Sequence, residues 1–383
     1  MNLFEFKKRI DFERSIFLKN KKINILIYGM QNVRGGVEMY LYNFAKYCDK
    51  TKFALSFLDT QTSEMIYKSE LEKLGCDVIK VNSAGKNFKA CVNELKNIFF
   101  EKEYDYIYIN VPSYSRFIFA LQKAKNKKTK MVLHSHGMLE MKKMPLKSRV
   151  SHYAGKYFFK NKPILRMACG KEAGKFLFAT KPFKVFFNGI EIDKFKYNEE
   201  FRNEIRGNFN LKEDELIFGN IARLSSEKNH MFLLEVFVEI LKLKPNSKLI
   251  LVGDGNDRKI LENRISELGI DENVILTGAR EDAYKFYSAL DAFVMPSIVE
   301  GFGISIAEAQ ANGLFCFGSD NLDKSTNLTG NVMYISLEKS SKEWAEIILE
   351  NMKRDLEAIN KFSIDYKAEE SYRKIFEYFE ENI

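Results

Sequence analysis

Short apolar runs alternate with longer amphipathic stretches along most of the chain. In the first half, six such runs resemble buried strands, and helical spacing over roughly 10 to 15 residues separates most of them. The runs are INILIY (23–28), FALSFL (53–58), DVIKV (77–81), YIYIN (106–110), KMVLHS (130–135) and ILRMAC (164–169). Strands that alternate with helices predict βαβ units, and therefore a parallel sheet with helices on its faces.

The same rhythm starts again in the second half. Its strand-like runs are LIFGNIAR (216–223), SKLILVG (247–253), NVILTG (273–278), DAFVMPS (291–297) and GLFCFGS (313–319). We therefore predict an α/β chain of two doubly wound, Rossmann-like parallel-sheet domains, 1–190 and 191–365, with the boundary near an Asn-Gly turn. A last helix in 366–383 is expected to pack back toward the first domain. Ligand is expected in the cleft where the carboxyl ends of both sheets face each other.

The composition fits a globular chain with two cores. The chain has 383 residues, of which 45% are hydrophobic, and this excludes a disordered protein. Its five cysteines form no CxxC pair, which indicates reduced thiols rather than a disulfide framework. No run reaches the roughly 18 apolar residues that span a bilayer. The first residues, MNLFEFKKRI, carry charges and lack the pattern of a secretion signal, so we expect a cytoplasmic protein.

Positive charge is concentrated in the first half. Residues 1–185 carry 36 Lys and Arg against 16 Asp and Glu, and segment 141–175 carries ten against one, interleaved with aromatic and aliphatic residues. No nucleic-acid-binding module is recognisable, so no nucleic-acid partner is expected. A basic, apolar surface that rests on anionic lipid explains the segment better, and solvated helix faces are the alternative. The first interpretation predicts a peripheral protein at the inner face of the cell membrane.

In doubly wound domains the chemistry lies on loops that follow strands. After the first strand, Gly35 and Gly36 open a helix whose free N–H groups suit a phosphate, although a purely structural turn would also use glycines. The GxGxxG spacing of a dinucleotide site is absent there. After the strand 130–135, we expect only one of His134 and His136 to face the cleft, and His136 is the better candidate. Because no Asp, Glu or Cys cluster accompanies these histidines, no metal site is expected.

The second half has a basic loop after its first strand. Arg223 and Lys228 stand in GNIARLSSEKNH, just before a helix predicted at 229–243. A guanidinium and an ammonium at a helix start suit a diphosphate leaving group, and no Walker loop is present. Gly253 in LVGDGNDRKI is a weaker nucleotide signal, because a tight strand-to-helix turn needs glycine in any case.

Two glutamates bracket a glycine-rich turn in SIVEGFGISIAEAQANG. Glu300 precedes the turn, and Glu308 lies inside the helix that begins near Ile304. A carboxylate repels a phosphate, but it accepts hydrogen bonds from paired hydroxyls. A nucleotide-diphosphate sugar would therefore suit the segment. Glu300 would bind the sugar hydroxyls, the helix start would bind the diphosphate, and Glu308 would bind the ribose diol.

These segments together resemble a known family. ARLSSEK, VGDGNDR and EGFGISIAE resemble, in order and spacing, the signatures of family 4 retaining glycosyltransferases, and GGVE and NGIEIDKF are similar too. The resemblance covers nearly the whole chain and implies the GT-B fold, with an N-terminal acceptor-binding domain and a C-terminal nucleotide-sugar-binding domain. HSHG, ACGKEAGKFLF and SLEKSSKEWAEIIL also resemble the branch that builds bacterial capsule and exopolysaccharide. One departure is the Ile-Val pair at 298–299, which would alter the shape of the sugar pocket.

The resemblance also implies the roles of site residues. The catalytic set would be Glu300, Arg223, Lys228 and His136, where the basic pair holds the diphosphate and His136 contacts the sugar near the reacting carbon. The donor would further contact Gly35, Gly36, Gly253, Arg280, Gly301, Phe302, Gly303, Ile304 and Glu308, with Arg280 bordering the nucleobase. No metal ion or other cofactor is implied.

The hypothesis that follows is a retaining transfer of a hexose from a nucleotide-diphosphate sugar, a UDP-sugar by preference. The acceptor would be a lipid-linked saccharide in cell-surface polysaccharide biosynthesis. Transfer to a protein or a small molecule is one alternative, and a non-catalytic nucleotide-sugar-binding protein is another. A glycoside hydrolase could use two glutamates roughly 5 to 9.5 Å apart, but it would leave the basic loop without a purpose. An NAD-dependent oxidoreductase is disfavoured by the missing GxGxxG.

Overall fold

The computed structural model describes residues 21–32, 35–82, 87–137, 141 and 144–383. The start of the chain, considered above for a secretion signal, and two lysines of the basic segment, Lys142 and Lys143, lie outside the described residues.

The first domain is built on a seven-stranded parallel sheet in the order β3-β2-β1-β4-β5-β6-β7. Its strands are β1 (Ile23–Tyr28), β2 (Phe53–Asp59), β3 (Asp77–Lys80), β4 (Tyr106–Asn110), β5 (Lys130–Ser135), β6 (Ile164–Ala168) and β7 (Lys184–Val185). Its helices are α2 (Gly36–Lys46), α3 (Lys68–Lys73), α4 (Phe88–Glu101), α5 (Arg116–Ala124), α6 (Leu146–Phe159) and α7 (Lys171–Phe178). Every residue of β4 is buried, because helices cover both faces of the sheet.

The second domain holds a six-stranded parallel sheet in the order β10-β9-β8-β11-β12-β13. Its strands are β8 (Leu216–Ile221), β9 (Ser247–Val252), β10 (Val274–Gly278), β11 (Ala292–Met295), β12 (Cys316–Ser319) and β13 (Val332–Ile335). Its helices are α8 (Ile192–Phe195), α9 (Glu199–Asn208), α10 (His230–Leu243), α11 (Arg258–Leu268), α12 (Ala283–Ala289), α13 (Ile304–Ala311) and α14 (Ser341–Asn351). The fold class is confirmed, although β13 was not among the predicted strands.

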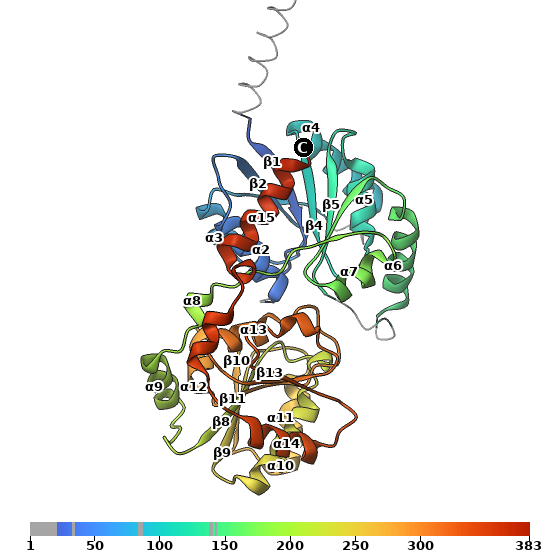
Figure 1. The fold of residues 1–383 in the computed structure, drawn as a ribbon. Coiled ribbons are helices and arrows are strands. Elements are labelled where there is room, and N and C mark those ends of the chain that lie inside the picture. Colours follow the sequence, from blue (N-terminus) through green and yellow to red (C-terminus); the bar gives the residue numbers. More distant parts are fainter. Residues whose placement is uncertain (1–20, 33–34, 83–86, 138–140, 142–143) are drawn as a thin grey trace, which may run out of the picture.

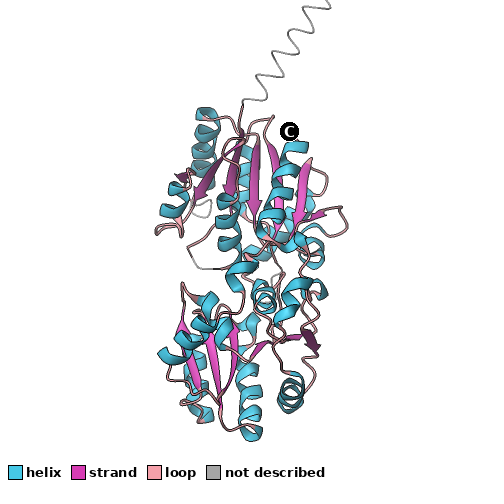
Figure 2. Cartoon of the chain, turned by 60° about the vertical axis from the view of Figure 1, so that its left-hand side comes forward, coloured by secondary structure: helices cyan, strands magenta, loops and turns pink. Residues whose placement is uncertain are grey.

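Each sheet separates two apolar cores, as Figure 2 shows by the helices on both faces of the strands. Along β1, Ile25 and Ile27 point into one core and Leu26 points into the other. This alternation follows from the two-residue period of a strand.

The chain passes between the domains twice. Backbone pairing joins Ile190 to Lys367, so the outward and the return segment lie side by side. After the return, α15 (Ala368–Glu381) buries Tyr372, Ile375 and Phe379 in the core of the first domain, beside α2 (Figure 1). None of the helices in the described part of the chain combines the length and hydrophobicity that crossing a bilayer requires.

Candidate active site

Two helices begin opposite each other between the domains. Helix α2 starts at Gly36 after β1, and α13 starts at Ile304 after β11. A Cβ placed on Gly36 would lie 3.5 Å from the Ile304 Cδ1 atom, so the two helix starts are in contact. Gly303 has a φ of +69°, which the sharp turn into α13 requires and which glycine adopts without strain. The free N–H groups and dipoles of both helices favour an anion at this point.

Arg223 reaches across to the first of these helices. Its Nη2 atom lies 2.9 Å from the position that a Cβ on Gly35 would occupy. Glu38 lies in the first turn of α2 and accepts a hydrogen bond from the Gln31 N–H at 3.4 Å. Burial raises the pKa of Glu38, and its hydrogen bonds and the charge of Arg223 offset only part of this rise. The guanidinium and the glycine turn of α2 therefore form one side of the cleft.

The loop that carries Arg223 is held by two glycines of the next strand-to-helix turn. Gly253, with a φ of +143°, would place a Cβ 1.9 Å from the Ala222 oxygen, and Gly255 would place one 2.2 Å from the Leu224 oxygen. Both positions exclude a side chain because the two backbones pack directly against each other. Packing therefore accounts for both glycines, and the contact of Gly253 with the donor stays a prediction.

Lys228 and Glu300 form an ion pair at the other side of the cleft. Lys228 ends the 3-10 turn η2 (Ser226–Lys228), and its Nζ donates to Glu300 Oε2. The two side chains are only 17% and 15% exposed, so water screens the pair weakly. The other Glu300 oxygen accepts the Gly301 N–H at 3.0 Å. The carboxylate is thereby fixed at the mouth of the turn into α13.

Backbone contacts dock the Glu300 loop onto η2. The Ile298 N–H donates to the Glu227 oxygen at 2.8 Å, and Asn321 Nδ2 donates to the Ile298 oxygen at 3.0 Å. Ser319 Oγ donates to the Ser297 oxygen at 2.5 Å. Ser319 and Asn321, for which the sequence predicted no role, therefore help to support the Glu300 loop.

His136 enters the cleft from the first domain. Its side chain lies on the same side of β5 as that of His134, with ring centroids 4.0 Å apart. Residues two apart in a strand share a face, so alternation does not separate the two rings as expected from the sequence. Depth separates them instead, because His134 is fully buried whereas His136 is partly exposed. The His136 oxygen also lies 2.5 Å from the position of a Cβ on Gly301, which brings the two domains into direct backbone contact.

Burial lowers the pKa of His136 to about 3, so its imidazole is neutral at physiological pH. Asn110, at the end of β4, faces His136 Nε2 with its Oδ1 at 2.8 Å. Because a carboxamide oxygen accepts a hydrogen bond, this contact favours the tautomer that carries its proton on Nε2. His136 is therefore suited to hydrogen bonding rather than to proton transfer.

Glu308 lines a cavity between the domains. Tyr40, Asn43 and Asn188 line the same cavity from the first domain and the connecting segment. Tyr287 Oη donates to Glu308 Oε2 at 2.6 Å. Burial raises the pKa of Glu308 to about 7, although the bond from Tyr287 and the charge of a nearby lysine, Lys194, act to lower it.

Two further predicted residues, Arg280 and Phe302, have partners within the protein itself. Arg280 follows β10, the outer strand of its sheet, and donates from Nε and Nη2 to Asp282 at 2.8 and 2.7 Å. The Phe302 ring is buried and stacks on Tyr366, so only the backbone of Phe302 is free to meet a ligand. Within the described ranges, no group of three or more His, Cys, Asp and Glu side chains is placed to hold a metal ion.

Sequence reasoning missed several polar residues of this site. Asn110, Tyr287 and Lys194 support or face the predicted side chains, and Asn188, which stands in the NGIEIDKF segment, received no role. A signal existed for Asn110, because it is the polar end of an otherwise apolar strand. In the sequence alone, Tyr287 cannot be distinguished from the ordinary core residues of α12.

Known proteins share this architecture and these segments. Residues 201–361 match the family model described as "Glycosyl transferases group 1". Over 86% of its length the chain is 27% identical to the putative glycosyltransferase EpsF of Bacillus subtilis (strain 168), of which the match covers 87%. It is 32% identical to the UDP-Gal:alpha-D-GlcNAc-diphosphoundecaprenol alpha-1,3-galactosyltransferase of Escherichia coli, over 38% of this chain and 36% of that protein.

The fold is also found among solved structures. The structure of Anabaena Alr3699/HepE in complex with UDP and glucose superimposes with a TM-score of 0.77. The two sequences are 20% identical, and the superposition covers 94% of this chain and 100% of the other.

Proposed function

Because the chain belongs to the group 1 (family 4) glycosyltransferases, which are retaining enzymes, we propose that it transfers a hexose from a UDP-sugar to a lipid-linked saccharide. The product would be part of a cell-surface polysaccharide. The observation that carries the proposal is the convergence of two helix starts, two cations and two carboxylates between the domains. The name of the E. coli relative supports a UDP-sugar donor and a diphosphate-linked lipid acceptor. The Anabaena structure, which holds UDP and glucose, supports the same donor class.

The diphosphate is the part of the donor that the cations fit. Arg223 offers a planar fork of donors, whereas Lys228 offers a compact charge, and the starts of α2 and α13 add free N–H groups. As the bond to the sugar breaks, negative charge grows on the departing diphosphate. Donors that are already in place stabilise this charge without reorganisation, and loss of one such donor costs about 3 to 4 kcal/mol of activation free energy.

The sugar and the ribose would be held by the carboxylates. Glu300 is neutralised by Lys228 in this arrangement, so it can accept sugar hydroxyls beside a diphosphate without strong repulsion. Glu308 would accept the two ribose hydroxyls. His136 is neutral and donates its ring proton to Asn110, so its other ring nitrogen would accept a hydrogen bond from a sugar hydroxyl near the reacting carbon.

Retention requires the acceptor hydroxyl to enter from the side on which the diphosphate leaves. The contact between Gly301 and the His136 backbone brings the domains together next to Glu300, where this reaction would take place. Closure removes water, which would otherwise compete with the acceptor for the activated sugar. No protein base is needed where the departing phosphate accepts the proton of the acceptor hydroxyl.

The test is nucleotide release from a panel of UDP-sugars, with and without a lipid-linked saccharide. We expect Arg223→Ala and Glu308→Ala to lower turnover by roughly 100-fold or more. The matched control is Arg373→Ala on α15, where the arginine is 55% exposed and pairs with Glu370 and Glu377 of the same helix, and it should retain activity.

Different results would contradict the site, the activity and the acceptor. Full turnover in both site variants would refute the site. Saccharide hydrolysis without a nucleotide would indicate a glycosidase, and the absence of nucleotide binding in calorimetry would indicate a non-catalytic protein. Stimulation by a protein or a small-molecule acceptor, but not by the lipid-linked saccharide, would refute the acceptor alone.

A further inference from the structure

Helix α6 presents an apolar stripe to solvent. Leu146, Val150, Tyr153 and Tyr157 are 73%, 60%, 57% and 86% exposed. Their spacing of four, three and four residues places them along one face of the helix. Contiguous exposed apolar surface of this kind marks an interaction site rather than ordinary scattered exposure.

The opposite face of α6 is firmly packed, so the stripe is not a core face turned the wrong way. Phe159 is buried and stacks on Tyr114 with ring centroids 5.4 Å apart. A Cβ on Gly155 would lie 2.3 Å from the Tyr114 side chain, so the helix backbone rests directly on that ring. His152 is buried on the same inner face. The outer face is left without a partner in the described chain.

The charges around the stripe have one sign. Lys147 lies on one flank of the stripe, and Arg149 and Lys156 lie on the other, by their positions in the helix. Segment 141–171 contains no Asp or Glu. Tyrosine also suits a boundary, because its ring is apolar and its hydroxyl is polar. An apolar strip between cations complements an anionic lipid surface, where acyl chains lie beneath negative headgroups.

We infer that α6 docks the protein on an anionic membrane, with the stripe of Leu146, Val150, Tyr153 and Tyr157 inserted at the boundary between headgroups and acyl chains. The flanking cations bind the headgroups. Docking needs no nucleotide and no acceptor, so it stands apart from the chemistry. Its benefit for transfer to a lipid-linked acceptor rests on the proposed function.

The position of α6 relates the docking face to the cleft. Figure 1 shows α6 at the outer margin of the first domain, beyond α5 and α7. The connection from β5 to α6 begins with His136 and Gly137, whose backbone contacts Gly301 of the second domain. From Gly137 to Leu146 the chain spans at most roughly 30 Å. Helix α6 therefore begins within about 30 Å of the contact between the domains, so a membrane under α6 is within one domain's diameter of that contact.

The experiment is sedimentation of the full chain with vesicles of phosphatidylcholine, alone or mixed with phosphatidylglycerol, at low and high salt. We expect binding to the anionic vesicles only, weakened by salt because the headgroup contacts are screened. The stripe variant Val150→Ser/Tyr153→Ser/Tyr157→Ser should bind at least about tenfold more weakly, since it loses most of the inserted apolar surface. Lys147→Glu/Arg149→Glu should have a similar effect through charge.

Matched controls separate the stripe from general surface changes. Phe100→Ser removes a ring that is 92% exposed on α4, and Lys259→Glu reverses an exposed charge on α11. Both controls should bind like the unchanged protein. All variants should keep nearly the same unfolding midpoint, because the altered side chains are largely exposed and the contacts of Tyr153 and Lys259 lie within their own helices.

Three outcomes would overturn the inference. These are equal binding to neutral and anionic vesicles, binding to neither, and a concentration-dependent dimer that the stripe variant abolishes, which would assign the face to a second copy of this chain. The enzyme assay is read separately. The stripe variant should release nucleotide normally with a detergent-dispersed acceptor and slowly with a vesicle-embedded one. Vesicle binding without any turnover would leave the docking face intact and refute only the proposed function.

Discussion

At the residue scale, Glu308 is subject to opposing effects. Removal of its carboxyl from water favours the neutral form, whereas the Tyr287 hydroxyl and the charge of Lys194 favour the ionised form. Burial dominates, and the pKa lies at about 7, so the residue titrates in the physiological range. The site thus holds a carboxyl group whose charge is costly until a ligand supplies further hydrogen bonds.

This balance predicts a pH-dependent stability. The pKa of Glu308 is raised in the folded state, from 4.5 to about 7, so its contribution is fully present below pH 4.5 and is lost as pH rises through 7. Glu308→Gln removes this dependence. Relative to the unchanged protein, the free energy of unfolding of the variant should rise between pH 5 and pH 8 by up to about 3 kcal/mol. Urea unfolding at the two pH values measures the difference.

Glu346→Gln is the matched control for that measurement, because this glutamate is exposed on α14 and pairs only locally with Lys342. Its unfolding free energy should differ from that of the unchanged protein equally at both pH values. A pH-independent difference for Glu308→Gln as well would show that the carboxyl is ionised throughout, contrary to its burial.

Individual residues differ in how far the sequence reveals them. Glu300 and Glu308 were recognisable because their spacing within one turn and one helix is local. Asn188 and Tyr287 reach the cavity or the side chain of Glu308 only through the fold, from segments about 120 and about 20 residues away along the chain, so no spacing rule finds them. For Gly253 the structure shows a packing requirement, but a glycine required by packing and one required by a phosphate look the same in a sequence, so its contact with the donor stays a prediction.

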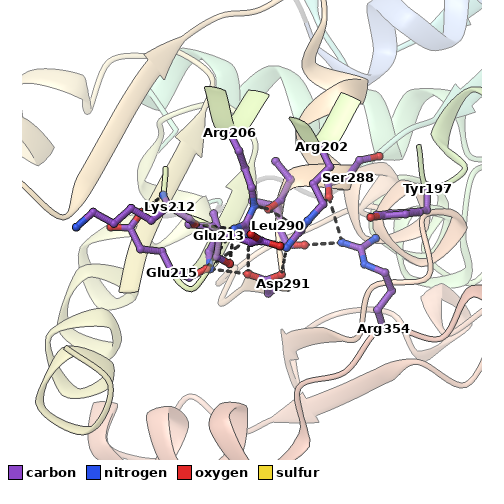
Figure 3. A network of polar contacts seen from close by, with 12 residues as sticks. Tyr197, Arg202, Arg206, Lys212, Glu213, Glu215, Ser288, Leu290, Asp291 and Arg354 are labelled. Atoms are coloured by element: carbon purple, nitrogen blue, oxygen red, sulfur yellow. Dashed lines mark hydrogen bonds and ion pairs between the residues drawn. The ribbon is translucent and has the colours of Figure 1, made fainter. Parts of the chain in front are cut away.

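At the element scale, a polar network fixes the start of β11, the strand that leads to Glu300. Asp291 accepts hydrogen bonds from Arg202 and Arg206 of α9 at 3.1 and 2.8 Å (Figure 3). It also accepts the Ile217 N–H at 2.8 Å. Arg354, after α14, donates to backbone oxygens at the end of α12, including that of Ser288. One carboxylate and three guanidinium groups thus tie α9 and the α12–β11 turn together.

We expect Asp291→Asn to lower the free energy of unfolding by about 2 to 4 kcal/mol, because it leaves two guanidinium groups without their counter-charge. Arg206 is only 8% exposed, so water compensates little. Asp193→Asn is the control, since that side chain is 88% exposed and pairs only with Lys196. The control should change stability by less than about 0.5 kcal/mol in the same urea titration. Equal effects of both substitutions would mean that the network adds nothing beyond a surface pair.

Elements were easier to predict than the directions they face. The long apolar runs located most strands, because strands buried on both sides are continuously apolar. The short edge strand β13 follows an irregular stretch and was missed. For α6, the sequence indicated a basic and apolar surface, but apolar residues occur all round this helix. Only the packing of Phe159 and Gly155 on Tyr114 shows which of them face outward.

At the scale of the whole molecule, two chain segments that lie side by side join the domains. In the cleft, the domains also touch each other directly through backbone atoms. Ile190 and Lys367 pair where the chain crosses, and α15 is anchored in the first domain by Tyr372 and its neighbours. The second domain is therefore joined covalently to the first at both its N-terminal and its C-terminal end. Motion of one domain relative to the other is then guided by these two crossings, and Gly301 lies where the domains meet on closure.

This arrangement predicts that Gly301→Ala impairs closure rather than folding. A Cβ there would lie 2.5 Å from the His136 oxygen and 2.9 Å from the Gly137 Cα atom, and both belong to the other domain. Neither atom is the end of a flexible side chain, so the clash is relieved only by separating the domains. Because catalysis depends on the distance between the diphosphate site and His136, a displacement of about 1 Å should reduce turnover by roughly 100-fold.

The unfolding midpoint of Gly301→Ala should stay unchanged, since the clash lies between domains and not within one. Gly207→Ala is the matched control, because a Cβ at that helical position meets nothing within 4 Å and turnover should be normal. Nucleotide release and thermal unfolding of both variants decide the matter. Normal turnover in Gly301→Ala would mean that the reaction proceeds with the domains further apart than this contact allows.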